Sequence, residues 1–114
     1  MLSSTAVRAY STARFIAEAL DYKIELIQQE KAIYEASVNT VLEVLRGLSD
    51  DKNVVFIFGH NPTFTMIAND FSDDYIENVP TCGIVAVEFD VDNWENLHQN
   101  NSRFLSFDFP KNYL

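Results

Sequence analysis

We expect the chain to be organised around the ten residues Asn53–Pro62, NVVFIFGHNP. Five consecutive apolar residues, Val54–Phe58, are typical of a strand that is buried on both faces, as in parallel sheets. A glycine and His60 follow at the carboxyl end of this strand. Asn61 is a residue type favoured as a helix N-cap, and Pro62 suits the first position of a helix. The stretch therefore predicts a strand, a tight turn and a helix N-terminus.

A turn of this kind makes His60 a candidate ligand for an anion. Ligands bind at the carboxyl ends of strands in open α/β sheets, and helix N-termini favour negatively charged groups. The alternative is that His60 only forms hydrogen bonds within the loop between the strand and the helix. The local sequence leaves both interpretations open.

The composition indicates one ordinary domain that interacts with neither nucleic acid nor membrane. The chain has 114 residues, of which 47% are apolar, so it can build a core. Its net charge of −9, from 17 acidic and 8 basic residues, argues against a nucleic-acid or anionic-membrane surface. A single cysteine, Cys82, excludes an internal disulfide and suits a reducing compartment. Neither an apolar run of about 20 residues nor a signal-peptide core is present, so we expect a cytoplasmic protein.

Alternating helices and strands predict an α/β layered domain with a largely parallel centre. The first helix follows an N-cap at Ser4 and continues to Leu20, the second lies between Ser37 and Gly47, and the third follows Pro62. Besides the strand at 54–58, strands are expected at 22–27, 84–90 and 103–109, and the last two can pair with each other.

Several polar segments are expected to be loops without ligands. The acidic run Asp70–Glu77 lacks the glycine and the ligand spacing of a calcium loop, so it predicts a solvated turn. Asn78–Gly83, NVPTCG, has turn composition. His98 lies in an expected loop and is assigned no role. We predict no metal and no cofactor.

Arg8 is a second candidate for anion binding. It lies in the first turns of a predicted helix, where a basic residue opposes the helix dipole. This placement indicates that Arg8 serves an anion rather than the helix. The alternative is a solvated surface arginine.

Three stretches together resemble the histidine phosphatase superfamily, which has the phosphoglycerate-mutase-like fold, and in particular its SixA-type phosphohistidine phosphatases. Leu2–Ala13, LSSTAVRAYSTA, is similar to that family's L-S-S-x-x-x-R-A-x-x-T-A segment. Val55–Pro62 looks like the strand and G-H-N-P turn, and Asn78–Phe89 looks like the N-x-P-T-C-G run with its following strand. With the closing FDFPK, the resemblance covers essentially the whole chain.

The resemblance implies a three-layer sheet flanked by helices and the hydrolysis of phosphomonoesters or phosphoramidates through a phosphohistidine. Arg8 and His60 are implied as catalytic phosphate ligands, with Asn61 beside them, and Glu35 is a candidate general acid. Cationic donors around the transferred phosphoryl group suit this chemistry. The implied substrate is a phosphorylated compound, either a histidine-phosphorylated protein or a small metabolite.

The family's nucleophile, in an R-H-G motif, has no counterpart in this sequence, because His60 and His98 are its two histidines. By resemblance, the R-H-G strand runs between the strand at Leu2 and the strand at 54–58. We therefore expect residues 1–114 to be one N-terminally truncated domain that lacks its central strand and is inactive by itself. Unpaired strand edges would favour a homodimer. Three hypotheses stay open: part of a phosphatase, a non-catalytic phosphate-binding or interaction module, and a folded fragment without function.

Overall fold

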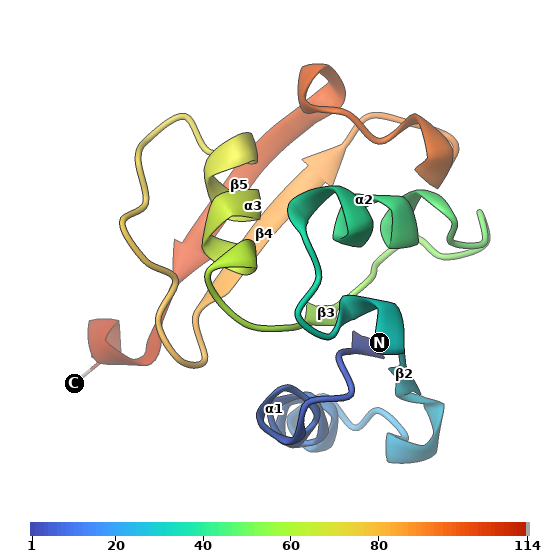
Figure 1. The fold of residues 1–114 in the computed structure, drawn as a ribbon, viewed down its shortest axis with the longest axis vertical. Coiled ribbons are helices and arrows are strands. Elements are labelled where there is room, and N and C mark those ends of the chain that lie inside the picture. The colour runs from blue at the N-terminus through green and yellow to red at the C-terminus, as the bar shows by residue number, and fades with distance from the viewer. Residues whose placement is uncertain (114) are drawn as a thin grey trace.

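Two separate sheets form the framework of the computed structural model, which describes residues 1–113 and the side chains of residues 1–111 (Figure 1). The first sheet is parallel with the order β2-β1-β3, and the second pairs β4 with β5 in antiparallel fashion. The strands are β1 (Leu2–Ser3), β2 (Gln28–Gln29), β3 (Ile57–Phe58), β4 (Ile84–Phe89) and β5 (Ser102–Asp108). The expected mixed α/β class is confirmed.

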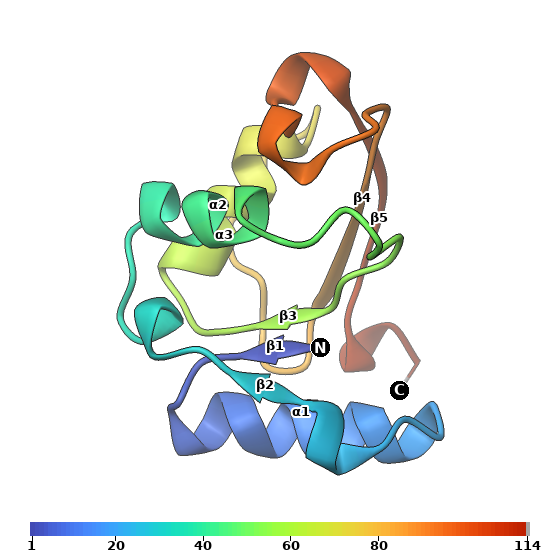
Figure 2. The same cartoon turned by 90° about the vertical axis from the view of Figure 1, so that its right-hand side faces the viewer.

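Three α-helices flank the parallel sheet: α1 (Val7–Ala19), α2 (Val38–Arg46) and α3 (Thr63–Phe71). Helix α1 lies on one face of the sheet, whereas α2 and α3 lie on the other (Figure 2). Short 3₁₀ turns occupy Ile24–Leu26, Lys31–Ile33, Trp94–Asn96, Gln99–Asn101 and Pro110–Tyr113. Within residues 1–113, no helix has the length and apolar character needed to cross a membrane.

Strand β1 is the centre of the parallel sheet and pairs directly with both neighbours. On the β3 side, the Leu2 backbone N–H donates to the Phe56 carbonyl at 2.8 Å, and the Ser4 N–H donates to the Phe58 carbonyl at 2.9 Å. The expectation that β1 and β3 would be left with unpaired facing edges is therefore wrong. Direct pairing satisfies the backbone donors and acceptors that a missing strand would leave exposed.

The predicted strand at 54–58 is much shorter than expected. Only Ile57 and Phe58 are in β3, whereas Val54 is 77% exposed and Phe56 is 37% exposed. The segment meets β1 over two residues only, so its earlier apolar residues have no strand beside them. The inference of a strand buried on both faces is wrong.

The predicted strand at 22–27 is also wrong. Ile24–Leu26 forms a 3₁₀ turn in which the Leu26 N–H donates to the Lys23 carbonyl and the Ile27 N–H to the Ile24 carbonyl, each at 3.0 Å. These local hydrogen bonds satisfy the backbone within the segment. The parallel strand starts one residue later, at Gln28.

Helix α1 follows the predicted apolar pattern but starts later than predicted. Its buried face consists of Ala9, Ala13 and Ala17, and small side chains let the helix approach the sheet closely. Ser4 is not the N-cap; it is fully buried, and its Oγ accepts a hydrogen bond from the Ala6 backbone N–H at 3.2 Å. The N-cap is Ala6, which has no side-chain acceptor of its own.

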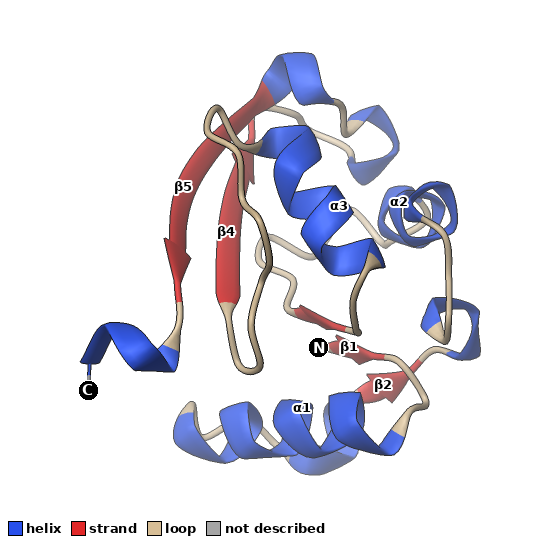
Figure 3. Ribbon diagram, turned by 60° about the vertical axis from the view of Figure 1, so that its left-hand side comes forward, coloured by secondary structure: helices blue, strands red, loops and turns tan. Residues whose placement is uncertain are grey.

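The expected pairing of the last two strands is confirmed, with β4 and β5 beside α3 (Figure 3). The Phe71 ring of α3 meets the Phe89 ring of β4 edge to face, with their centroids 5.3 Å apart. This contact joins the antiparallel sheet to the helical layer.

Helix α2 begins and ends where the sequence predicts, and its N-cap gives a first test of stability. The Ser37 Oγ accepts a hydrogen bond from the Thr40 backbone N–H at 3.2 Å. We expect Ser37→Ala to lower the free energy of unfolding by about 1 kcal/mol, because that N–H loses its acceptor. Urea denaturation would measure the change. Ser37→Asp keeps an acceptor and should stay near wild type; equal losses in both variants would contradict the capping role.

Candidate functional site

The carboxyl ends of β1 and β3 lie side by side and form the edge from which two helices start. Leu2 pairs with Ile57 and Ser3 with Phe58 in parallel register. Both strands run toward the same side of the molecule, where the chain continues into α1 and α3 (Figure 2). The positive ends of two helix dipoles therefore belong to one edge of the sheet.

His60 follows β3 at this edge and is exposed. Its ring centroid lies 6.4 Å from that of Tyr34, with an angle of 50° between the rings. The Thr63 Oγ1 donates a 2.6 Å hydrogen bond to the Ala36 carbonyl. The segment Tyr34–Ala36 is thus held against the turn that carries His60.

Glu35 lies in the middle of the segment beside His60. Its side chain is exposed, and its backbone has a φ of 51°, in the left-handed region that few non-glycine residues adopt. Because Tyr34 and Ala36 both contact the His60 turn, Glu35 lies on the same side of the sheet as His60.

Arg8 is the second residue of α1 and therefore lies near the same edge. It is exposed, and its guanidinium forms neither a hydrogen bond nor an ion pair with the described part of the chain. The first turn of α1 has no acidic residue. An unpaired cation beside the positive end of a helix dipole is suited to an anionic ligand.

Asn61 uses its whole side-chain amide within the fold. Its Nδ2 donates to the Asn78 Oδ1 at 3.0 Å and to the Val79 carbonyl at 2.7 Å. Its Oδ1 accepts from the Thr65 backbone N–H at 3.1 Å and from the Thr65 Oγ1 at 2.7 Å. An amide has only two N–H donors, so none is left for a ligand in this arrangement. Asn61 joins the start of α3 to the segment at Asn78.

Helix α3 begins at Thr63, one residue after the position predicted from Pro62. The acceptor for the first turn is still the Asn61 side chain, as its residue type suggests. The peptide bond between Asn61 and Pro62 is cis.

Sequence reasoning missed three residues that shape this edge: Tyr34, Thr63 and Thr65. Tyr34 and Thr63 hold the Glu35 segment beside His60, and Thr65 completes the Asn61 network. The spacing of four between Asn61 and Thr65 was an available signal, because such residues neighbour each other on a helix. The other two contacts join segments about 27 residues apart, and no local pattern reveals them.

Arg8 and His60 each carry a side chain that can donate hydrogen bonds to an anion. Arg8 can offer a planar pair of donors, and the His60 ring can offer an N–H. Within residues 1–113, no three His, Cys, Asp or Glu side chains lie close enough together to hold a metal ion.

The chain is similar to a curated protein of Mycobacterium leprae described as uncharacterized protein ML1117. The two are 25% identical over 120 aligned residues, which cover 97% of this chain and 71% of the mycobacterial protein. No family model matches the sequence. No solved structure matches it.

Proposed function

We propose that the carboxyl edge of the β2-β1-β3 sheet binds a phosphoryl group in the manner of a histidine phosphatase. The observation that carries this proposal is the parallel pairing of β1 with β3, which starts α1 and α3 from one edge. Arg8 and His60, the two candidates from sequence, belong to the segments that leave these strands. The phosphoglycerate-mutase-like arrangement is part of the same proposal, since removal of its R-H-G strand would bring β1 next to β3.

Each residue has a distinct role in the proposed site. Arg8 pairs with two phosphoryl oxygens, and a ring N–H of His60 donates to a third. Glu35 is the proposed general acid that protonates the leaving group, and the support for this role is the hydrogen bond that ties its segment to Thr63 through Ala36. Asn61 positions the turn and does not contact the phosphoryl group.

Hydrolysis through a covalent phosphohistidine needs a second histidine at this edge. The sequence offers only His98, which lies between β4 and β5, where its Nδ1 accepts from the Asn100 backbone N–H at 3.1 Å. We propose that these 114 residues bind phosphate without turnover and that an added R-H-G segment would complete a phosphohistidine phosphatase.

A non-catalytic phosphate-binding module is the second candidate function. The direct hydrogen bonds between β1 and β3 favour it, because they occupy the backbone groups that a nucleophile strand would use. The coding sequence upstream of Met1 separates the two candidates. An in-frame strand ending in R-H-G supports the phosphatase, and its absence supports the module.

Phosphate binding is tested by comparing Arg8→Ala with Arg14→Ala, which removes an exposed arginine from the same helix. Inorganic phosphate should raise the melting temperature of wild type and of Arg14→Ala. At 100 times the Kd, the stabilisation should be about 2.7 kcal/mol. Arg8→Ala should need at least about tenfold more phosphate, since a charge-assisted bidentate pair contributes roughly 1.5–3 kcal/mol.

Two results would contradict this proposal. One is that phosphate does not raise the melting temperature of wild type. The other is that Arg8→Ala and Arg14→Ala lose phosphate affinity equally. The turnover of phosphohistidine by the pure protein would contradict the absence of catalysis. His60→Ala would then show whether this histidine is required for that turnover.

A further inference from the structure

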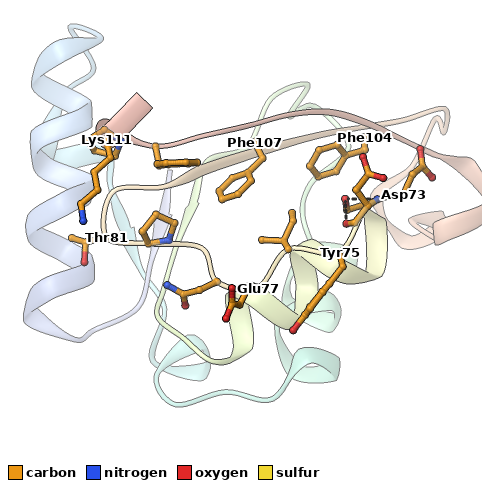
Figure 4. A pocket seen from close by; sticks show the side chains of 14 residues that line it. Asp73, Tyr75, Glu77, Thr81, Phe104, Phe107 and Lys111 are labelled. Atoms are coloured by element: carbon orange, nitrogen blue, oxygen red, sulfur yellow. Dashed lines mark hydrogen bonds between the residues drawn. The ribbon is translucent and has the colours of Figure 1, made fainter. Parts of the chain in front are cut away.

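An open groove of about 940 Å³ lies between the loop that follows α3 and strand β5 with its closing turn (Figure 4). Residues 72–78 form one wall. The rest of the lining is largely apolar and comes from Pro80, Phe104, Phe107, Phe109 and Pro110. Neither Arg8 nor His60 lines this groove, so it is separate from the proposed phosphate site.

The floor of the groove is aromatic and incompletely covered. The rings of Phe107 and Phe109 contact each other with centroids 5.2 Å apart, and both side chains are half-buried. Phe104 is half-buried as well, whereas Ile76 in the opposite wall is only 7% exposed. Concave aromatic surface of this kind is suited to large apolar side chains.

The wall facing Phe107 is acidic. Asp73, Asp74 and Glu77 are exposed, and their carboxylates form no ion pair with the described residues. Tyr75 lies among them and is 77% exposed (Figure 4). Lys111 is the one basic residue among those that line the groove. The charge of the wall is complementary to lysine or arginine side chains.

Hydrogen bonds hold the second half of this wall in place. Near α3, the Asn69 side chain accepts from the Ile76 N–H at 2.8 Å and donates to the Ile76 carbonyl at 2.7 Å. Two residues further along the chain, Asn61 binds Asn78 and the Val79 carbonyl. A wall held in this way loses little conformational entropy when a ligand binds.

We infer that this groove docks a segment of a partner protein in which basic residues alternate with large apolar ones. Its apolar side chains would lie on Phe104 and Phe107, and its basic side chains would face Asp73, Asp74 and Glu77. A second copy of this chain is a poor occupant, because each copy has a net charge of −9. The inference does not depend on the proposed phosphate site.

The test uses a fluorescein-labelled peptide of sequence R-L-R-W-R-L-R and fluorescence anisotropy against the full chain. Wild type should bind it saturably. Tyr75→Ala should weaken binding at least threefold. Tyr75 is 77% exposed, and thermal melts of each variant check that the fold is unchanged. The groove variant Asp73→Asn/Asp74→Asn/Glu77→Gln should weaken binding at least tenfold.

A matched triple variant controls for the overall negative charge. Glu18→Gln/Glu25→Gln/Glu43→Gln removes three exposed carboxylates that do not line the groove, and its affinity should stay within twofold of wild type. Equal weakening in both triple variants would overturn the inference. So would heptaarginine binding as tightly as the probe, since that peptide has no apolar side chains, and so would the absence of saturable binding.

Discussion

Gly59→Ala is expected to lower the free energy of unfolding by roughly 1–3 kcal/mol, the usual cost of overpacking. A Cβ atom at Gly59 would lie 2.3 Å from the Phe64 Cε1 and 2.4 Å from its Cζ. These atoms belong to the far end of the ring, so the ring would have to rotate away from the turn. Phe64 is half-buried in the first turn of α3, and its displacement would disturb the turn that carries His60.

Two control variants make this prediction specific. At Gly47 an added Cβ meets only carbonyl oxygens at 3.5 and 3.6 Å, and φ is −86°, so Gly47→Ala should be neutral or slightly stabilising. In a Phe64→Leu background the clash at Gly59 is relieved, and the added cost of Gly59→Ala should fall to a few tenths of a kcal/mol. Urea denaturation of the four proteins in this cycle measures the coupling. Additive effects would show that the ring does not restrict Gly59.

Asn69→Ala is expected to lower the free energy of unfolding by roughly 2–4 kcal/mol, because it removes both partners of a buried backbone unit. Ile76 is 7% exposed, and its N–H and carbonyl both bind the Asn69 side chain. Asn69 also donates to the Thr65 carbonyl at 3.1 Å. Without Asn69, Ile76 in the acidic wall of the groove would lose its hydrogen bonds to α3.

Asn69→Asp and Asn100→Ala complete this test. The aspartate keeps an acceptor for the Ile76 N–H but has no donor for the Thr65 and Ile76 carbonyls. Asn69→Asp should therefore lower the free energy of unfolding by less than Asn69→Ala does. Asn100 is exposed, and its side chain forms no hydrogen bond with the described residues, so Asn100→Ala should stay near wild type. Protection of the Ile76 amide from hydrogen exchange reports the attachment directly. Unchanged protection in Asn69→Ala would contradict its role.

Features that depend on neighbouring residues were predictable from the sequence. Ser37 and Gly47 bound α2 because their hydrogen bonds involve the helix itself. The NVPTCG turn closes with the Gly83 N–H donating to the Pro80 carbonyl at 2.8 Å. The bounds of β4 and β5 also match the predicted strands to within one residue. Each of these features is set by backbone geometry or periodicity over a few residues.

The residues of the candidate site were named from the sequence, whereas the contacts that connect them could not be predicted from it. Arg8, Glu35, His60 and Asn61 were singled out by residue type, helix position or resemblance. Their surroundings depend on contacts between distant segments, such as Thr63 with Ala36 and Asn61 with Asn78. The sequence could not show that both amide N–H groups of Asn61 form hydrogen bonds within the fold, because the acceptors on Asn78 and Val79 lie 17 and 18 residues away.

The stretch Asn53–Pro62 shows which features the local sequence determines and which ones the tertiary structure determines. Its residue types alone determine a turn with His60 followed by a helix whose first turn is capped by Asn61. How much of the stretch becomes a strand depends on the partner that lies beside it. Because β1 offers only two residues for pairing, Ile57 and Phe58 join the sheet and Val54 stays exposed. A strand needs a neighbour to satisfy its backbone, and only the tertiary structure supplies one.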